Sequence, residues 1–143
     1  MVKKVVASVG LPNSGKSTWA KQTSDETGWP IVSKDSIRLA LHGQKFSDEA
    51  EPWISVMAQT MIKSLFYSGH EIVIVEECNC NSEDRYEWMS DEWKTEFVLI
   101  GTPKEECLRR ADMDEEYGIK PIIEREFERW EDPPEIMTYT YKV

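Results

Sequence analysis

The chain has 143 residues, a length that predicts one domain over residues 1–143 and leaves no room for a separate regulatory or targeting module. Hydrophobic residues make up 40% of the sequence and charged residues 31%, which excludes an intrinsically disordered chain. The formal net charge of -10 excludes a protein that holds duplex nucleic acid through many phosphate contacts, because such binding needs a basic face.

The charge is distributed unevenly along the chain. Residues 1–46 carry seven basic and three acidic side chains, and the remainder carries most of the acidic ones. We therefore expect an anionic ligand to bind the N-terminal third. The apolar run after Lys3 and Lys4 is shorter than the roughly 7 to 15 residues of a signal-peptide core, and no stretch approaches the roughly 18 that span a bilayer. These features predict a cytoplasmic protein with no membrane partner.

Short apolar runs alternate with stretches of helix-forming residues along the sequence. In chain order we expect a strand at 4–9, a helix at 16–27, a strand at 30–33, helices at 36–41 and 49–68, a strand at 71–75, a helix at 82–89, a strand at 97–100, helices at 104–112 and 121–130, and an edge strand at 136–141. This alternation predicts an α/β fold of the P-loop NTPase type, with a parallel sheet of about five strands and helices on both faces.

The segment between the first strand and the first helix carries a phosphate-binding motif. It matches Gly-x-x-x-x-Gly-Lys-Ser/Thr at every fixed position. Backbone N–H groups of such a loop surround phosphate oxygens, Lys16 reaches the β and γ phosphates, and the Ser17 hydroxyl binds Mg²⁺. An ordinary glycine-rich turn is the alternative. The predicted nucleotide-binding residues are Gly10, Pro12, Asn13, Ser14, Gly15, Lys16, Ser17 and Thr18.

Two charged residues follow the second predicted strand. The carboxyl ends of neighbouring parallel strands open on one crevice, so Asp35 is expected near the γ phosphate. A carboxylate there can accept the proton of an attacking hydroxyl, and Arg38, one helical turn later, can hold an anionic acceptor or the carboxylate itself. The alternative is an Asp35 helix cap with a surface pair to Arg38.

The third predicted strand ends in two carboxylates. P-loop proteins usually carry at this place an acid that holds Mg²⁺ through water, and strand register decides whether Glu76 or Glu77 does so. A solvated strand end is the alternative. Cys78 and Cys80 follow, with histidines too few and too distant for a zinc site. We therefore interpret the cysteines as small core residues.

Arginines lie on the two helices that flank the acidic segment 113–120. They are Arg109, Arg110, Arg125 and Arg129. A small kinase needs arginines over the transferring phosphoryl group to offset charge that develops in the transition state, and a helix pair can supply them as a lid. We expect this helical lid over approximately residues 109–125. Ordinary surface charges among the neighbouring glutamates are the alternative for each arginine.

The motif segment 10–20, in which Trp19 and Ala20 follow Lys-Ser-Thr, resembles the P-loop of the bacteriophage polynucleotide kinase family. Segment 33–38 is similar to that family's next motif, and the resemblance implies that Asp35 is the general base and that Arg38 lies in the acceptor pocket. Segment 77–81 with Arg85 resembles the third block, which begins with Asp in the family. The resemblance runs from Val2 to about Trp93 and more loosely to 133–134.

The resemblance implies an ATP- and Mg²⁺-dependent kinase with a hydroxyl acceptor. Lys16, Asp35 and Arg110 would be catalytic, and Arg38, Glu77, Asn79 and Arg85 would bind the acceptor. The basic lid segment that follows the arginine in the family is acidic here, so a second lid arginine must be Arg125 or Arg129, or be absent.

Relatives of that family imply several acceptors. These are a 5′-hydroxyl end of a nucleic acid, the hydroxymethyl group of 5-hydroxymethyluracil in DNA, a nucleotide or a metabolite. The acidic composition favours one nucleotide end or one flipped base over a long polynucleotide channel. A small-molecule kinase and a nucleotide-hydrolysing switch are the alternatives. The cytoplasm would be that of the host if the protein is phage-encoded.

Overall fold

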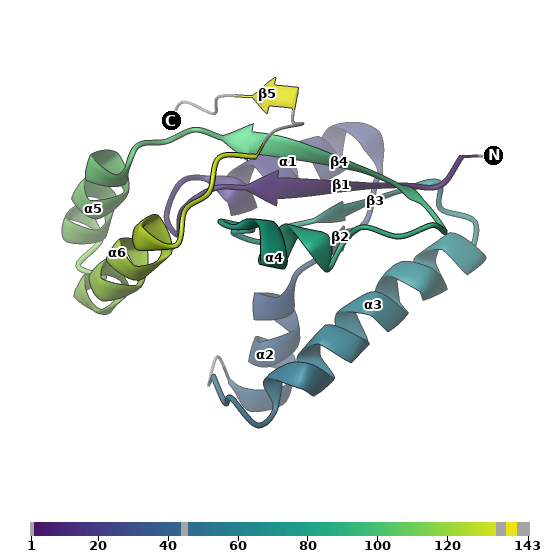
Figure 1. The fold of residues 1–143 in the computed structure, drawn as a ribbon, viewed down its shortest axis with the longest axis horizontal. Helices are drawn as coiled ribbons and strands as arrows, with labels where there is room; N and C mark the ends of the chain where they lie inside the picture. Colours follow the sequence, from purple (N-terminus) through teal and green to yellow (C-terminus); the bar gives the residue numbers. More distant parts are fainter. Residues whose placement is uncertain (1, 44–45, 134–136, 140–143) are drawn as a thin grey trace.

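The computed structural model describes residues 2–43, 46–133 and 137–139. Five strands form one parallel sheet in the order β2-β3-β1-β4-β5 (Figure 1). The strands are β1 (Lys4–Val9), β2 (Ile31–Val32), β3 (Ile72–Val75), β4 (Lys94–Ile100) and β5 (Met137–Tyr139). The predicted α/β class and the parallel sheet of about five strands are confirmed.

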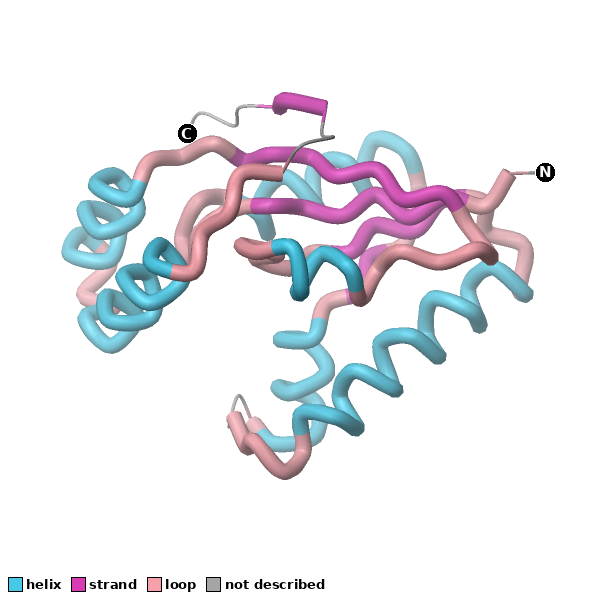
Figure 2. Tube along the Cα trace, viewed as in Figure 1, coloured by secondary structure: helices cyan, strands magenta, loops and turns pink. Residues whose placement is uncertain are grey.

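Helices lie on both faces of this sheet, as Figure 2 shows with the helices in cyan and the strands in magenta. They are α1 (Lys16–Thr27), α2 (Lys34–His42), α3 (Glu51–Tyr67), α4 (Ser82–Tyr86), α5 (Lys104–Met113) and α6 (Lys120–Glu128), with a short 3-10 turn at Tyr117–Ile119. The pair α5 and α6 stands beyond the carboxyl ends of β1 and β4 (Figure 1). The lid predicted over residues 109–125 falls on these helices and the segment between them, and its action as a lid stays a prediction.

Strand β1 shows why the sheet is covered on both sides. Its side chains point alternately to the two faces of the sheet. Val5, Ala7 and Val9 pack with α3, and Val6 packs with α1 on the opposite face. A strand buried on both faces reads as a continuous apolar run rather than as an alternating one. The β-branched run before the phosphate-binding motif therefore becomes the central strand, and it delivers the motif to the carboxyl edge of the sheet.

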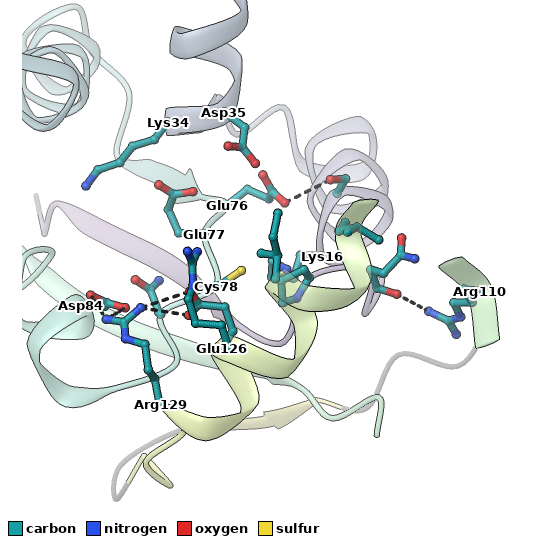
Figure 3. A pocket seen from close by; sticks show the side chains of 18 of the residues that line it. Lys16, Lys34, Asp35, Glu76, Glu77, Cys78, Asp84, Arg110, Glu126 and Arg129 are labelled. Carbon is teal, nitrogen blue, oxygen red and sulfur yellow. Dashed lines mark hydrogen bonds and ion pairs between the residues drawn. The ribbon is translucent and has the colours of Figure 1, made fainter. Parts of the chain in front are cut away.

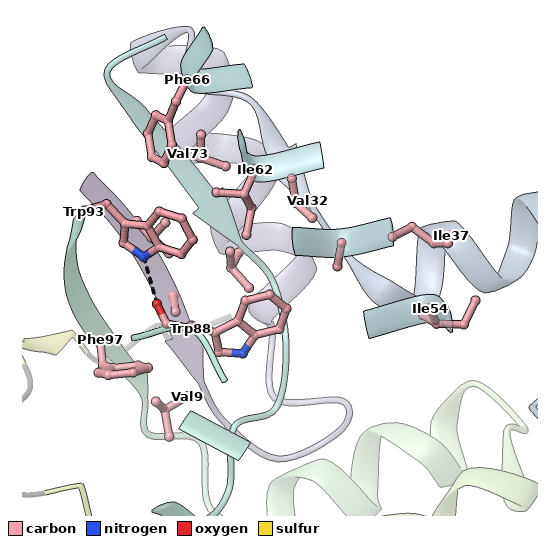
Figure 4. Close-up of a cluster of buried hydrophobic side chains, with 14 residues drawn as sticks. Val9, Val32, Ile37, Ile54, Ile62, Phe66, Val73, Trp88, Trp93 and Phe97 are labelled. Carbon is pink, nitrogen blue, oxygen red and sulfur yellow. Dashed lines mark hydrogen bonds between the residues drawn. The ribbon is translucent and has the colours of Figure 1, made fainter. Parts of the chain in front are cut away.

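A tryptophan pair closes the core beneath α3 (Figure 4). The indole of Trp93 donates a hydrogen bond of 2.8 Å to the carbonyl of Trp88, and both rings are buried. This contact explains two boundary differences. The predicted helix 82–89 ends at Tyr86, before the buried Trp88, and the predicted strand 97–100 begins already at Lys94, next to Trp93.

The C-terminal prediction is met in part. Residues 137–139 form β5, which pairs in parallel with β4 at the edge of the sheet. The other residues of the predicted strand 136–141 lie outside the described residues. No helix within the described part of the chain is long and apolar enough to cross a membrane.

Replacing Ile62 by Ala should lower the free energy of unfolding by about 2 to 5 kcal/mol, because the side chain is fully buried between α3 and the sheet and its loss leaves a cavity. Val56→Ala, on the exposed side of the same helix, should change it by less than about 0.5 kcal/mol. Urea unfolding of both variants measures the difference. Equal losses would contradict the assigned packing of α3.

Candidate active site

The carboxyl ends of β1 and β3 open into a cavity of about 1180 Å³. It is lined by the phosphate-binding motif, the start of α2, the segment after β3, and helices α5 and α6 (Figure 3). Pockets for one small ligand usually have about 300 to 1000 Å³. The volume of this cavity lies above that range.

The phosphate-binding motif folds into a loop in which two residues have a left-handed backbone conformation. Asn13 has φ 69° and Gly15 has φ 106°, a region that glycine enters without strain. Gly10 is required for another reason: a Cβ there would lie 2.7 Å from the Ser14 hydroxyl oxygen. The loop is thus built for close backbone packing, and α1 begins immediately after Gly15.

The start of α1 fits a phosphate group. No described side chain caps its first turn, so the N–H groups there and the helix dipole face the cavity. The Lys16 ammonium is buried beside them and donates a 2.7 Å hydrogen bond to the Leu11 carbonyl. Burial alone would lower the pKa of Lys16, but the nearby Cys78 and Glu76 outweigh it and the net pKa is raised. Lys16 therefore stays a full positive charge.

The chain after β3 is held against β1 by one hydroxyl. Ser8 Oγ donates to the carbonyl of Glu77 at 2.7 Å and accepts from its N–H at 3.0 Å. This contact fixes the direction of the two neighbouring carboxylates. Glu76 then accepts a hydrogen bond of 3.1 Å from the Ser17 hydroxyl.

The pair of Ser17 and Glu76 fits a divalent cation. A hydroxyl and a carboxylate are the oxygen ligands that Mg²⁺ prefers, with water completing its shell. Of the two carboxylates that strand register left open, the structure brings Glu76 to Ser17. Glu77 instead faces Lys34 and Asp35 (Figure 3).

Glu77 lies in a poorly solvated part of the cavity. Its burial, followed by the effects of Cys78 and Asp35, raises the pKa of Glu77 well above its ordinary value. A carboxyl in this state holds its proton longer and can donate a hydrogen bond. The acceptor side of the cavity therefore contains a carboxyl group, that of Glu77, which can donate a hydrogen bond.

The predicted acceptor base lies at the start of α2. Ser33 caps this helix through the N–H of Ser36, so Asp35 is free of the capping role that the sequence left open. The Asp35 side chain is 83% exposed and accepts a 2.7 Å contact from Arg38. Both line the cavity. Asp35 thus combines access for a ligand with a fixed direction.

Arg38 is held from its other side by Glu51 at the start of α3. Its Nε donates to one Glu51 oxygen at 2.9 Å, and a second nitrogen contacts the other oxygen. Both side chains are mostly buried, at 16% and 23% exposure. The positive charge of Arg38 is already paired with two carboxylates, Asp35 and Glu51. It is therefore not free to bind an anionic acceptor.

Two residues predicted to bind the acceptor form hydrogen bonds within the protein. The Asn79 amide donates to the Ser8 carbonyl and accepts from the Trp88 indole. Arg85 is buried and donates to the Asn79 carbonyl at 3.0 Å, and it does not line the cavity. Arg85 thus supports the loop after β3 from outside the cavity lining, and its role in acceptor binding stays a prediction.

The predicted lid arginines differ in what they contact. Arg110 donates to the Asn13 carbonyl of the phosphate-binding loop at 3.2 Å, so α5 brings it to the donor site. Arg109 is exposed and pairs with Glu106. Arg129 connects Glu126 of α6 with Asp84 of α4, and Arg125 remains largely exposed beside Glu126. Of these four arginines, all of them described by the structure, Arg110 is the one that hydrogen-bonds the phosphate-binding loop.

One cysteine departs from its interpretation as a core residue. Cys80 and Cys107 are buried, whereas Cys78 is half-buried and lines the cavity beside Lys16. Hydrogen bonding from Cys80 lowers the pKa of Cys78 below its ordinary value, and the Lys16 charge acts in the same direction. The wall behind Lys16 is therefore polar.

This combination of parallel sheet, phosphate-binding loop and paired Ser17 and Glu76 defines a P-loop nucleotide-binding protein. A family model described as an AAA domain matches residues 5–132. The chain belongs to this family of P-loop kinase-like domains.

Solved structures share the fold. A chain of a Pnkp1/Rnl/Hen1 RNA repair complex matches with a TM-score of 0.75 and 24% identity over 90% of this chain. A gluconokinase from Sinorhizobium meliloti matches with 0.63 and 21% over 97%. The Mycobacterium tuberculosis APS kinase CysC matches with 0.65 and 19% over 99%. The match covers 81% of the gluconokinase and 91% of CysC. A chain of a second Pnkp1/Rnl/Hen1 complex structure matches with a TM-score of 0.66 and 24% identity over 76% of this chain, and the chain spans only 39% and 44% of the two Pnkp1/Rnl/Hen1 chains.

Several cavity residues escaped the sequence analysis. Glu51, Phe46 and Lys34 line the cavity, and Lys34 pairs with Glu87 at 2.7 Å. Lys34 stands next to Asp35 and could have been singled out by that adjacency alone. Glu51 and Phe46 carry no motif, because only the packing of α2 against α3 brings them to Arg38.

Glu51→Gln should lower the free energy of unfolding at pH 7 by about 1 to 3 kcal/mol, because it breaks charged hydrogen bonds to Arg38. Arg38 holds the pKa of Glu51 below its ordinary value of 4.5, so this stabilisation is lost as the pH falls through the folded-state pKa. Thermal unfolding of wild type and variant at pH 7 and pH 3 measures the effect.

The difference in stability between wild type and Glu51→Gln should be smaller at pH 3 than at pH 7. The exposed Glu49→Gln serves as the matched control and should show little effect at either pH. A Glu51→Gln deficit of equal size at both values would mean that shape, not charge, makes the contact important.

Proposed function

We propose that this protein transfers the γ phosphate of ATP to a hydroxyl group of a nucleic-acid or nucleotide acceptor. One observation supports the proposal: an accessible carboxylate, Asp35, and the phosphate-binding loop line the same cavity. Such a carboxylate suits a proton acceptor for an alcohol. The resemblance of segments 10–20, 33–38 and 77–81 to bacteriophage polynucleotide kinases supports the choice of acceptor.

The donor side consists of the loop, Lys16 and Ser17. Loop N–H groups and the Lys16 ammonium would bind the β and γ phosphates, and Ser17 with Glu76 would hold Mg²⁺, directly and through water. The bound Mg²⁺ would supply charge neutralisation on the phosphate oxygens. Arg110, fixed at the loop by Asn13, would reach charge that develops on the transferring group.

The acceptor side consists of Asp35 and Glu77. The acceptor hydroxyl loses its proton to Asp35 while its oxygen forms a bond to the γ phosphorus, and the bond from that phosphorus to the β–γ bridging oxygen breaks. Arg38 fixes the direction of the Asp35 carboxylate, and Glu77 can hydrogen-bond the same hydroxyl. The protein's contribution is mainly positioning, as in other phosphoryl transfers.

A small-molecule kinase on the same scaffold is the second candidate, and the charge pairing in the cavity favours it. On the acceptor side Lys34 pairs with Glu87, Arg38 with Asp35 and Glu51, and Arg129 with Asp84 and Glu126. Cations that already have carboxylate partners attract an acceptor phosphate only weakly. An acceptor without its own phosphate would suit this wall.

Labelled ATP offered with a panel of alcohols tests the proposal. The panel contains oligonucleotides with 5′-hydroxyl ends, DNA with 5-hydroxymethyluracil, nucleosides and sugars. We expect label on a nucleic-acid or nucleotide hydroxyl, and its loss by several orders of magnitude in Lys16→Ala, which excludes a contaminating kinase. Transfer to nucleosides or sugars, with none to the oligonucleotides or the modified DNA, would establish the second candidate. ATP hydrolysis without transfer to any alcohol would establish a switch and overturn both.

Asp35→Asn should reduce turnover by roughly 10² to 10⁴, because the amide keeps the shape and loses the proton acceptor. The KM for ATP should stay nearly unchanged, since Asp35 lies outside the phosphate-binding loop. Steady-state kinetics with the preferred acceptor measures both constants. Asp25→Asn, an exposed change on α1, is the matched control. Weakened ATP binding with normal turnover at saturation would make Asp35 a donor-site residue instead.

A further inference from the structure

The loop between α2 and α3 presents an aromatic ring that the proposed mechanism does not use. Phe46 is 59% exposed and lines the cavity. Single exposed apolar side chains are common and need no explanation. Among the exposed aromatic residues that the structure describes, however, only Phe46 lines this cavity; the others are Trp53, Tyr67, Tyr86, Tyr117 and Phe127.

The position of the ring is tied to the predicted base through one guanidinium group. The Arg38 Cζ lies 5.5 Å from the centre of the Phe46 ring, within the range of a cation–π contact. The same guanidinium contacts Asp35 at 2.7 Å and is held by Glu51. Phe46 and Asp35 therefore contact the same guanidinium group, and both line the cavity.

The affinity for an acceptor must come from groups that are still available. The cations of the acceptor side already contact carboxylates, and the Asn79 amide is used by Ser8 and Trp88. Among the described residues that line the cavity, Phe46 presents the exposed aromatic ring, and the other exposed large apolar side chains there, Met113 and Ile122, lie on α5 and α6. A flat ring stacks on such a surface, whereas an aliphatic polyol gains little from it.

We propose that Phe46 is the stacking platform for a planar ring that the acceptor carries close to its reactive hydroxyl. The inference rests on the proposed kinase activity and narrows its substrate class to alcohols attached to a nucleobase or a comparable flat heterocycle. Arg38 covers the ring on one side, and the acceptor stacks on the other. Phe46 sets specificity, and Asp35 performs the proton transfer.

The test compares Phe46→Ala and Phe46→Trp with wild type on matched acceptors. The acceptors are a nucleoside, an oligonucleotide with a 5′-hydroxyl end, the same oligonucleotide with an abasic 5′-terminal residue, and a sugar alcohol. Phe46→Ala should raise the KM for base-bearing acceptors about tenfold or more, because replacing a stacking aromatic residue by alanine removes the binding free energy of the stacked base. Its kcat, its KM for ATP and its KM for the abasic oligonucleotide should change less than about twofold. Phe46→Trp should restore the low KM.

Tyr67→Ala is the matched control, since Tyr67 is exposed at the far end of α3 and outside the cavity. It should behave as wild type. The nucleoside and the oligonucleotide distinguish a free ring from one within a polynucleotide. A Phe46→Ala variant with unchanged KM for base-bearing acceptors overturns the stacking role while the kinase activity stands.

Calorimetric binding decides the inference even if no acceptor of the panel is phosphorylated. Nucleoside is titrated into protein saturated with a non-hydrolysable ATP analogue, for wild type and Phe46→Ala. Loss of nucleoside binding in the variant supports the platform. Equal binding by both proteins, or no binding by wild type, overturns it. Failure of phosphoryl transfer in the panel overturns only the proposed function.

Discussion

The pairing of β1 with the chain that leaves β3 is the constraint on which the site depends. Ser8 fixes the backbone of Glu77 with two hydrogen bonds, and the Gly10 N–H continues the pairing to the Cys78 carbonyl at 2.9 Å. Because side chains alternate along extended backbone, this register sends Glu76 toward Ser17 and Glu77 toward Asp35. A shift of this pairing by one residue would exchange the directions in which the Glu76 and Glu77 side chains point.

The second half of the site depends on a bond between helices. Glu51 at the start of α3 holds Arg38 of α2, and Arg38 in turn orients Asp35. Asp35 can therefore remain exposed to a ligand and still keep its direction. Across the cavity, Arg129 joins α6 to α4, and Arg110 joins α5 to the phosphate-binding loop. Charged contacts thus connect the walls of the cavity, in addition to the buried cluster in which Cys107 and Ala111 of α5 and Ile123 of α6 pack with Leu11 and Cys80.

Local signals account for what the sequence could predict. The glycine spacing of the phosphate-binding loop, the strand before it and the helix after it depend on neighbouring residues, and all are found. The choice between Glu76 and Glu77 depends on register, which comes from Ser8, a residue 69 positions away along the chain. The burial of Arg85 and the clamp by Glu51 depend on tertiary packing. Nothing in a linear pattern separates a buried arginine that supports a loop from one that faces a ligand.

The Mg²⁺ dependence of phosphoryl transfer in Glu76→Gln and Glu77→Gln tests the central claim, that this register divides one pair of carboxylates between donor and acceptor. Glu76→Gln should raise the Mg²⁺ concentration for half-maximal activity by about 10- to 100-fold, as loss of an outer-sphere metal partner does, with the acceptor KM little changed. Glu77→Gln should change acceptor kinetics and leave the Mg²⁺ requirement as in wild type. The reverse pattern, or equal Mg²⁺ effects in both variants, would contradict the account.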